Sequence, residues 1–180
     1  MIWKITRTYK MFTITVKGWN NKMTKIISID PGYERLGIAV IEKEGSKNTL
    51  LFSECFKTSA KLEFTERLHL LGERVEEIIK KYKPRALAIE KLYFENNQKT
   101  AMQVAEVRGA LIYIAMKTGL EVFEYTPLQI KVAVTGYGKS DKKAIAMMVP
   151  KLIHIQNSIE SDDEMDAVAC GLTCLACEKL

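Results

Sequence analysis

The sequence predicts an α/β domain built on a five-stranded mixed sheet with helices on both faces. Three observations lead to this prediction. Three short β-rich segments follow one another at hairpin distance between residues 25 and 57, and helical and strand patterns then alternate along the rest of the chain. A strand in each of these two parts ends on an acidic residue. Three antiparallel strands followed by right-handed crossovers produce this architecture.

The first half of the chain contains three expected strands and one expected helix. The strands are expected at 25–30, 36–43 and 49–57, because these short runs are rich in β-branched and aromatic residues. Pro31-Gly32 and Gly45-Ser46 supply the turns that make them an antiparallel meander. Apolar residues at helical spacing then predict a helix over 61–82, which ends before Pro84.

The second half alternates between strands and helices. The run "RALAIE" predicts a buried strand that ends on Glu90, and a helix over about 99–117 and a strand in "LEVFEYT" follow. Thr126-Pro127 has the pattern of an N-cap with proline at the first helical position, and that helix extends to Gly136. Ser140 or Asp141 caps another helix, which Pro150 is expected to end or kink, and the last helix begins near Ser161.

Charge is distributed unevenly along the 180 residues. Residues 1–22 contain five basic residues and no acid, which leaves 22 basic against 22 acidic residues in the remainder. We expect 1–22 to be a basic N-terminal extension, either a mobile arm or a segment upstream of a natural start at Met23, and 23–180 to form a single domain. The chain shows neither a secretory signal nor an apolar run long enough to span a bilayer, so we expect a cytoplasmic location.

Four cysteines could in principle serve a metal or a disulfide. Cys170, Cys174 and Cys177 recur at helical spacing in an apolar segment, and Cys55 lies in an expected strand. Zinc would need a further soft ligand, and the chain has only two histidines. We therefore interpret the three C-terminal cysteines as small hydrophobic residues of the core.

Four acidic residues are candidates for a common site. Asp30 and Glu90 each end a strand, and the two strands become neighbours if the 61–82 helix returns the chain across the sheet. Asp163 and Asp166 share one face of the last helix, although acids also favour a helix start through the helix dipole. Oxygen ligands of this kind suit Mg²⁺, with Mn²⁺ as substitute, and a pair of ions serves phosphoryl displacement.

Four blocks of the sequence, in order and at matching spacing, resemble the RuvC family of Holliday junction resolvases over about residues 24–176. They are "IISIDPGYERLGIAVIE", "ALAIEKLYFENNQKTAMQVAEVRGALI", "VFEYTPLQIKVAVTGYGKSDKKAIAMMV" and "DDEMDAVACGL". The resemblance implies a ribonuclease H-like fold and places the family's four metal-binding acids on Asp30, Glu90, Asp163 and Asp166. The extension 1–22 and Pro150 depart from the family's pattern.

The resemblance also indicates residues that face DNA. Tyr93 falls where the family places an aromatic ring against an unpaired base, and such a ring can stack on any base. Lys131 and Lys142 align with basic positions near the junction, and Lys143 is a weaker candidate beside them, as are Lys139 and Arg108. The alternatives are a hydrophobic lid for the aromatic loop, a solvated face for the lysines, and a structural role between helix and sheet for Arg108.

The function that follows is a Mg²⁺-dependent, structure-selective endonuclease with two-metal hydrolysis, which resolves Holliday junctions in DNA recombination and repair by symmetric paired nicks. A two-fold symmetric substrate implies a homodimer, and the resemblance implies a branch-migration helicase as partner. Three alternatives stay open: a ribonuclease H-like nuclease that acts on RNA, a non-catalytic junction-binding module, and an actin-like ATP-binding domain. The last needs a second domain, for which we expect no room.

Overall fold

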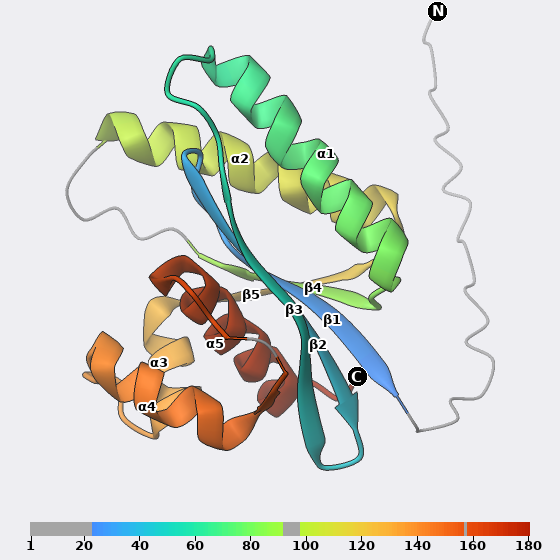
Figure 1. Cartoon of the computed structure of the whole chain (residues 1–180), viewed down its shortest axis with the longest axis vertical. Helices are drawn as coiled ribbons and strands as arrows, with labels where there is room; N and C mark the ends of the chain where they lie inside the picture. The colour runs from blue at the N-terminus through green and yellow to red at the C-terminus, as the bar shows by residue number, and fades with distance from the viewer. Residues whose placement is uncertain (1–22, 92–97, 157) are drawn as a thin grey trace, which may run out of the picture.

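A computed structural model describes residues 23–91, 98–156 and 158–180 (Figure 1). In this part of the chain, one mixed sheet contains six strands in the order β5-β4-β1-β2-β3-β6. Strands β1, β4 and β5 run parallel to one another, β2 is antiparallel to both of its neighbours, and β6 is parallel to β3. The strands are β1 Thr24–Asp30, β2 Arg35–Glu44, β3 Lys47–Lys57, β4 Ala86–Glu90, β5 Glu121–Tyr125 and β6 His154–Ile155.

Helices cover both faces of this sheet, as the sequence predicts. Helices α1 and α2 lie on one face, and α3, α4 and α5 lie on the other (Figure 1). The helices are α1 Phe64–Tyr82, α2 Gln98–Lys117, α3 Pro127–Thr135, α4 Lys142–Leu152 and α5 Asp162–Cys177. The expected layers and element order are therefore confirmed.

The prediction of five strands is wrong, because β6 adds a sixth strand to the edge of the sheet. It has only two residues, which pair with Thr49 and Leu50 of β3. Two residues are too few to show an alternating pattern, so no local signal distinguishes them from a loop. They pair with β3 only because α4 returns the chain to that edge.

The capping residues fix where the last helices begin. The side chain of Asp141, rather than Ser140, accepts a hydrogen bond from the Ala144 amide at the start of α4. The side chain of Ser161 caps α5 in the same way, where the sequence predicts it. Pro150 lies inside the last turn of α4, and the helix ends two residues later, close to the expected end.

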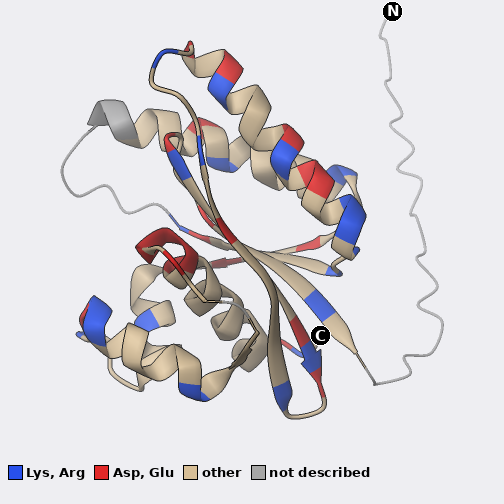
Figure 2. Ribbon diagram, viewed as in Figure 1, with Lys and Arg blue, Asp and Glu red and all other residues tan. Residues whose placement is uncertain are grey.

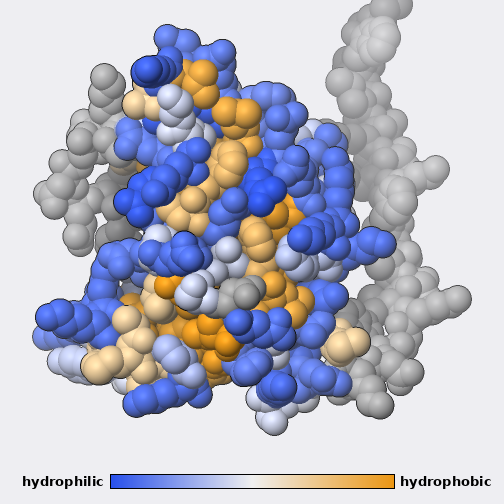
Figure 3. Space-filling view, viewed as in Figure 1, coloured by the Kyte–Doolittle hydropathy of each residue, from blue (hydrophilic) through white to orange (hydrophobic). Residues whose placement is uncertain are grey.

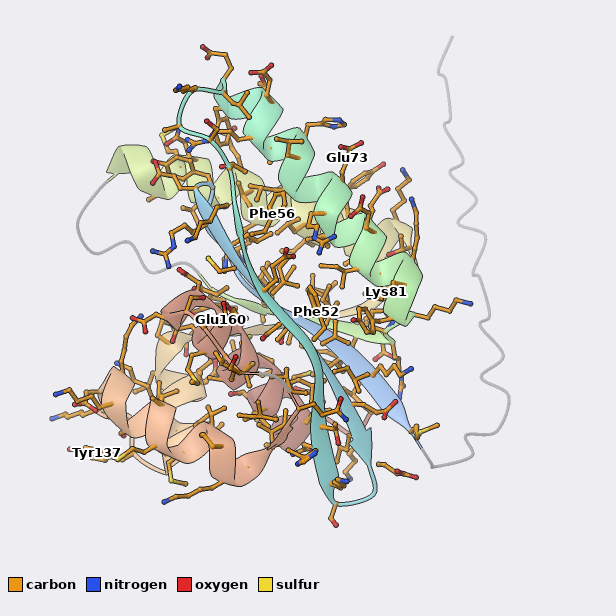
Figure 4. All side chains as sticks on the ribbon, viewed as in Figure 1. Phe52, Phe56, Glu73, Lys81, Tyr137 and Glu160 are labelled. Carbon is orange, nitrogen blue, oxygen red and sulfur yellow. The ribbon has the colours of Figure 1, made fainter. Side chains whose placement is uncertain are left out.

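Alternation along the strands separates two cores. In β1, Ile27 and Ile29 pack against the α1 and α2 face, whereas Ile26 packs against the α5 face. On β3, Phe52 and Phe56 belong to the α1 side, and Figure 4 shows both between β3 and α1. Asp30 is in phase with Ile26, so it faces the same side of the sheet as α5.

The α5 face is packed from small residues, which let the helix lie close to the strands. A Cβ on Gly171 would lie 2.6 Å from Ser28 Oγ and 2.7 Å from a methyl carbon of Ile41. Cys170 and Cys174 are fully buried in this core, as predicted, but Cys177 is exposed because it lies at the end of the helix. The site that α5 carries is thus held at short range from the sheet.

The surface in Figure 3 is mainly hydrophilic, with an apolar area in the lower half, in the region that α4 and α5 occupy in Figure 1. Within the described ranges, no helix combines the length and the apolar character that crossing a membrane requires.

Candidate active site

Two of the four predicted acids are brought together by parallel strand pairing. Asp30 is the last residue of β1, and Glu90 is the last residue of β4. Ile29 of β1 pairs with Ile89 of β4, so the two acids follow at the same end of neighbouring strands. Glu90 is in phase with Ala88, which packs on the α5 side. Both carboxylates therefore project toward the start of α5.

The other two acids are brought to the same place by the first turns of α5. Gly37 of β2 pairs with Asp30 and also supports the helix. A Cβ at this position would lie 2.0 Å from the Asp163 carbonyl oxygen and 3.2 Å from Asp30 Cβ. Only glycine, which has no side chain, allows the Asp163 backbone and Asp30 to lie so close to this position of β2. Figure 2 shows the concentration of acidic residues at the start of α5.

The strand acids lie in an environment that disfavours their charged form. Burial raises the pKa of Asp30 to about 7, and the charges of Asp166 and Asp163 add to the effect. Burial likewise raises the pKa of Glu90 to about 7, with further contributions from Asp30 and Asp166. No side chain in the described ranges donates a hydrogen bond to, or pairs with, either carboxylate. The charge of Lys142, and for Glu90 also that of Lys131, acts to lower these pKa values but does not offset the effect of burial.

The helix acids, by contrast, each have a cationic partner. Lys142 Nζ lies 2.9 Å from Asp166 Oδ2, and this hydrogen bond raises the pKa of Lys142. The guanidinium of Arg35 forms an ion pair with Asp163 Oδ2, and the Cys55 thiol lies 3.3 Å from the same oxygen. The two cations neutralise half of the acidic set.

The donor chemistry of this cluster fits a hard divalent cation. All four side chains offer carboxylate oxygens, and two of them are half-buried and form no ion pair with the described side chains. In the part of the chain that the structure describes, no three acidic, histidine or cysteine side chains are arranged to hold one ion together. Binding by three of them at once thus requires side-chain movement. The ion pair of Lys142 with Asp166 Oδ2 is one contact that such movement can open.

A cleft beside the acids contains the predicted lysines. It has a volume of about 200 Å³ and is lined by Glu90, Pro127, Ile130, Lys131, Lys142, Ile145 and Asp166. The structure thus brings Lys131 and Lys142 together with two of the acids, as predicted. Lys143 lies next to Lys142, is exposed, and contributes to the basic start of α4 (Figure 2). Tyr93, the predicted stacking residue, lies outside the described residues.

Sequence reasoning missed three residues that shape the site: Arg35, Gly37 and Cys55. The first two share the α5 face with Asp30, and Cys55 pairs with Gly37 on β3. Strand alternation could have placed Arg35 and Gly37 on that face, because both lie an even number of residues from Ala39. The residue of β3 that lies opposite Gly37 depends on the register between the two strands, and the alternation of residues along a strand does not predict that register. For Arg108, the structural role is confirmed, because its Nε donates to the Glu90 carbonyl oxygen at 3.1 Å and its guanidinium pairs with Glu124.

Comparisons with known proteins are consistent with this geometry. The family model for crossover junction endodeoxyribonuclease RuvC matches residues 26–174. A crossover junction endodeoxyribonuclease RuvC from Thermosipho melanesiensis is 41% identical over 154 residues, which cover 86% of this chain and 98% of that protein. The relative from Ruminiclostridium cellulolyticum is 38% identical over 147 residues, which cover 82% of this chain and 89% of that protein.

Solved structures show the same fold. The structure of T. thermophilus RuvC in complex with Holliday junction substrate matches with a TM-score of 0.79 and 31% identity, over 85% of this chain and 93% of that one. The yeast mitochondrial Holliday junction resolvase Ydc2 matches with a TM-score of 0.63 at 10% identity, over 83% of this chain and 78% of that one, which shows the fold alone. The expected ribonuclease H-like fold is confirmed. By its sequence and its fold, this chain belongs to the RuvC family of crossover junction endodeoxyribonucleases.

Proposed function

We propose that this protein is a divalent-cation-dependent endonuclease that resolves Holliday junctions by symmetric paired nicks in DNA recombination and repair. The observation that carries the proposal is the convergence of four carboxylates at the end of β1, β4 and the start of α5, beside a cleft with two lysines. The solved relative that matches over most of the chain binds a Holliday junction substrate.

Asp30, Glu90, Asp163 and Asp166 are the proposed ligands of two Mg²⁺ ions, with Mn²⁺ as substitute. Bound ions of this kind activate the attacking water and stabilise the leaving oxygen of a phosphodiester. The four carboxylates supply the negative charge that binds such ions, and Asp30 and Glu90 supply it from fixed positions on the sheet. Their raised pKa values mean that cations compete with protons for these carboxylates.

Four residues are proposed to contact DNA. Lys131 and Lys142 line the cleft beside the acids, and Lys143 extends the basic surface at the start of α4. A phosphate backbone is repelled by a cluster of carboxylates, so cations beside it are needed for binding. Tyr93 is proposed to stack on a base near the cut site.

We also propose a homodimer, because the two halves of a four-way junction are related by symmetry. Helix α2 has exposed apolar side chains of the kind that an interface needs, with Tyr113 66% and Met116 61% exposed. The other assignments also remain proposals: a branch-migration helicase as partner, a cytoplasmic location, a single nuclease domain over 23–180, and residues 1–22 as a separate basic extension.

The test is cleavage of three substrates by the same protein preparation. A synthetic four-way junction, a linear duplex and an RNA–DNA hybrid are incubated with Mg²⁺ and with EDTA. We expect paired nicks at symmetric positions of the junction, in Mg²⁺ only, with little cutting of the duplex. Preferred cutting of the hybrid would indicate an RNA nuclease instead. Tight junction binding without any cutting would indicate a non-catalytic module.

A further inference from the structure

Asp163 differs from the other acids of the cluster in how one of its oxygens is held. Asp163 Oδ2 forms an ion pair with the Arg35 guanidinium and accepts a hydrogen bond from the Cys55 thiol. The Cys55 side chain also interacts with the Arg35 guanidinium and raises its pKa, so the three side chains form a closed triangle. Among the residues that the structure describes, none forms a hydrogen bond or an ion pair with the other oxygen, Oδ1.

The partners of Asp163 come from the sheet rather than from its own helix. Arg35 begins β2 and lies two residues before Gly37, on which the Asp163 backbone rests. Cys55 of β3 pairs directly with Gly37, so it lies on the same face, one strand further out. Backbone and side chain of Asp163 are therefore both fixed against β2 and β3.

We propose that Arg35 and Cys55 are positioning residues that hold Asp163 Oδ2, so that the carboxylate offers only Oδ1 to a divalent cation. This inference rests on the proposed function, because it assumes that Asp163 is a cation ligand. Residues that hold a metal-binding side chain in place increase the affinity of the site for the cation. They do so because the side chain is already ordered and loses less conformational entropy when the cation binds.

Electrostatics alone predicts the opposite effect of Arg35. A positive charge beside a cation site repels the cation, so a variant without this charge should bind the cation more tightly. Holding the ligand in place should instead make the wild type bind more tightly. The sign of the change in affinity therefore separates the two roles.

A second contact keeps α5 in place when Arg35 or Cys55 is changed. Ser53 Oγ of β3 donates to Glu164 Oε2 at 2.7 Å, next to Asp163 in the first turn of the helix. Glu164 is 6% exposed and also accepts a hydrogen bond from Ser161, the N-cap. We therefore expect variants at Arg35 and Cys55 to fold, which thermal unfolding checks.

The experiment measures Mn²⁺ binding to the full chain without DNA, from the EPR signal of free Mn²⁺. Arg35→Lys keeps the positive charge but loses the planar fork that matches a carboxylate. We expect its Mn²⁺ affinity to fall by about tenfold. Cys55→Ala should show a smaller fall, and Cys55→Ser should restore most of it, because a hydroxyl can still donate to Oδ2.

Lys57→Gln is the matched control. Lys57 pairs with Arg35 across β2 and β3, but no ion pair joins it to Asp163 in the described part of the chain. This variant removes a neighbouring positive charge and leaves the triangle intact, so we expect unchanged or slightly tighter Mn²⁺ binding.

Unchanged affinity in Arg35→Lys together with tighter binding in Arg35→Gln would overturn the inference, because Arg35 would then act only as a neighbouring charge. Normal Mn²⁺ binding with weakened junction binding in Arg35→Lys would also overturn it and make Arg35 a DNA contact. A wild type that binds no Mn²⁺ would overturn the proposed cation dependence itself. That outcome is visible before any variant is compared.

Discussion

The four acids of the cluster belong to two groups that the fold treats differently. Asp30 and Glu90 are fixed on strand ends, half-buried, and without an ion pair in the described structure. Asp163 and Asp166 lie on a helix that leaves them partly open to solvent, and each has a cation beside it. Burial and the neighbouring carboxylates disfavour the charged form of the strand pair, whereas each helix acid is paired with a cation.

This difference shows how a cation site can exist before the cation binds. Four carboxylates in one place are costly, and the cost is limited by protonation of the strand pair and by ion pairing of the helix pair. A bound cation removes the need for both. The comparison between strand acids and helix acids can be tested in four ways.

The first test concerns activity, in which the two groups should behave alike. Asp30→Asn, Glu90→Gln and Asp166→Asn should each lower the rate of junction cutting on the order of 10³-fold, because a cation ligand is lost. Single-turnover cutting of a four-way junction in Mg²⁺ measures this. Junction affinity in Ca²⁺ should be retained, and cutting by Asp30→Asn at the wild-type rate would show that the site is wrongly assigned.

The second test concerns Gly37, where the two groups meet. Gly37→Ala introduces a Cβ that would lie 2.0 Å from the Asp163 carbonyl oxygen, so the start of α5 has to shift. We expect a loss of stability of about 1–3 kcal/mol, as for overpacked cores, together with weaker cutting. Chemical denaturation measures the stability.

Gly109→Ala in α2 is its control, because a Cβ there meets nothing within 4 Å. That variant should be neutral or more stable, since alanine favours helix more than glycine does. Equal losses in the two variants would mean that the close approach at Gly37 is not needed.

The third test concerns stability, in which changes to the two groups should have effects of different size. The raised pKa of Asp30 means that the folded protein holds a proton that the unfolded chain releases near pH 4. The stability of the cation-free protein should therefore fall as pH rises from about 4 to about 7. Asp30→Asn should remove this loss and, at pH 8 in EDTA, be more stable than wild type by on the order of 2 kcal/mol.

Asp166→Asn should bring a smaller gain, because it removes a charge that repels Asp30 and Glu90 but also breaks the ion pair with Lys142, which is worth ~0–1 kcal/mol at an exposed position. Thermal unfolding in EDTA at pH 4, 6 and 8 separates the two variants. An Asp30→Asn protein that is less stable than wild type at pH 8 would contradict the idea that the strand acids repel one another.

The fourth test concerns the lysines. Lys142 is already paired with Asp166, whereas Lys143 beside it is exposed at the same helix start. Lys142→Ala should lower the slope of log K against log salt for junction binding by about one in Ca²⁺. The effect should be smaller in EDTA, because the unoccupied site keeps the lysine on Asp166. Lys143→Ala should give the same slope change in both conditions, and identical behaviour of the two variants would argue against an exchange of partners by Lys142.

Local patterns in the sequence are sufficient to predict most of the fold. The sequence predicts the meander, the helices on both faces, the cap at Thr126 and the start of the last helix near Ser161, because period, turn residues and N-caps act within a few residues of one another. The order of strands and helices along the chain also predicts that Asp30 and Glu90 lie at the ends of neighbouring strands. The two-residue strand β6 was missed, because its pairing depends on where α4 returns the chain.

The partners of the acids, by contrast, depend on how the folded chain packs. Arg35 and Cys55 meet Asp163 across more than 100 residues of sequence, and Gly37 is needed because a helix backbone rests on it. The raised pKa values of Asp30 and Glu90 likewise come from burial and from charges on distant elements. A sequence shows which residues can carry charge, but the free energy of each charge depends on what surrounds it, and only the packed chain determines those surroundings.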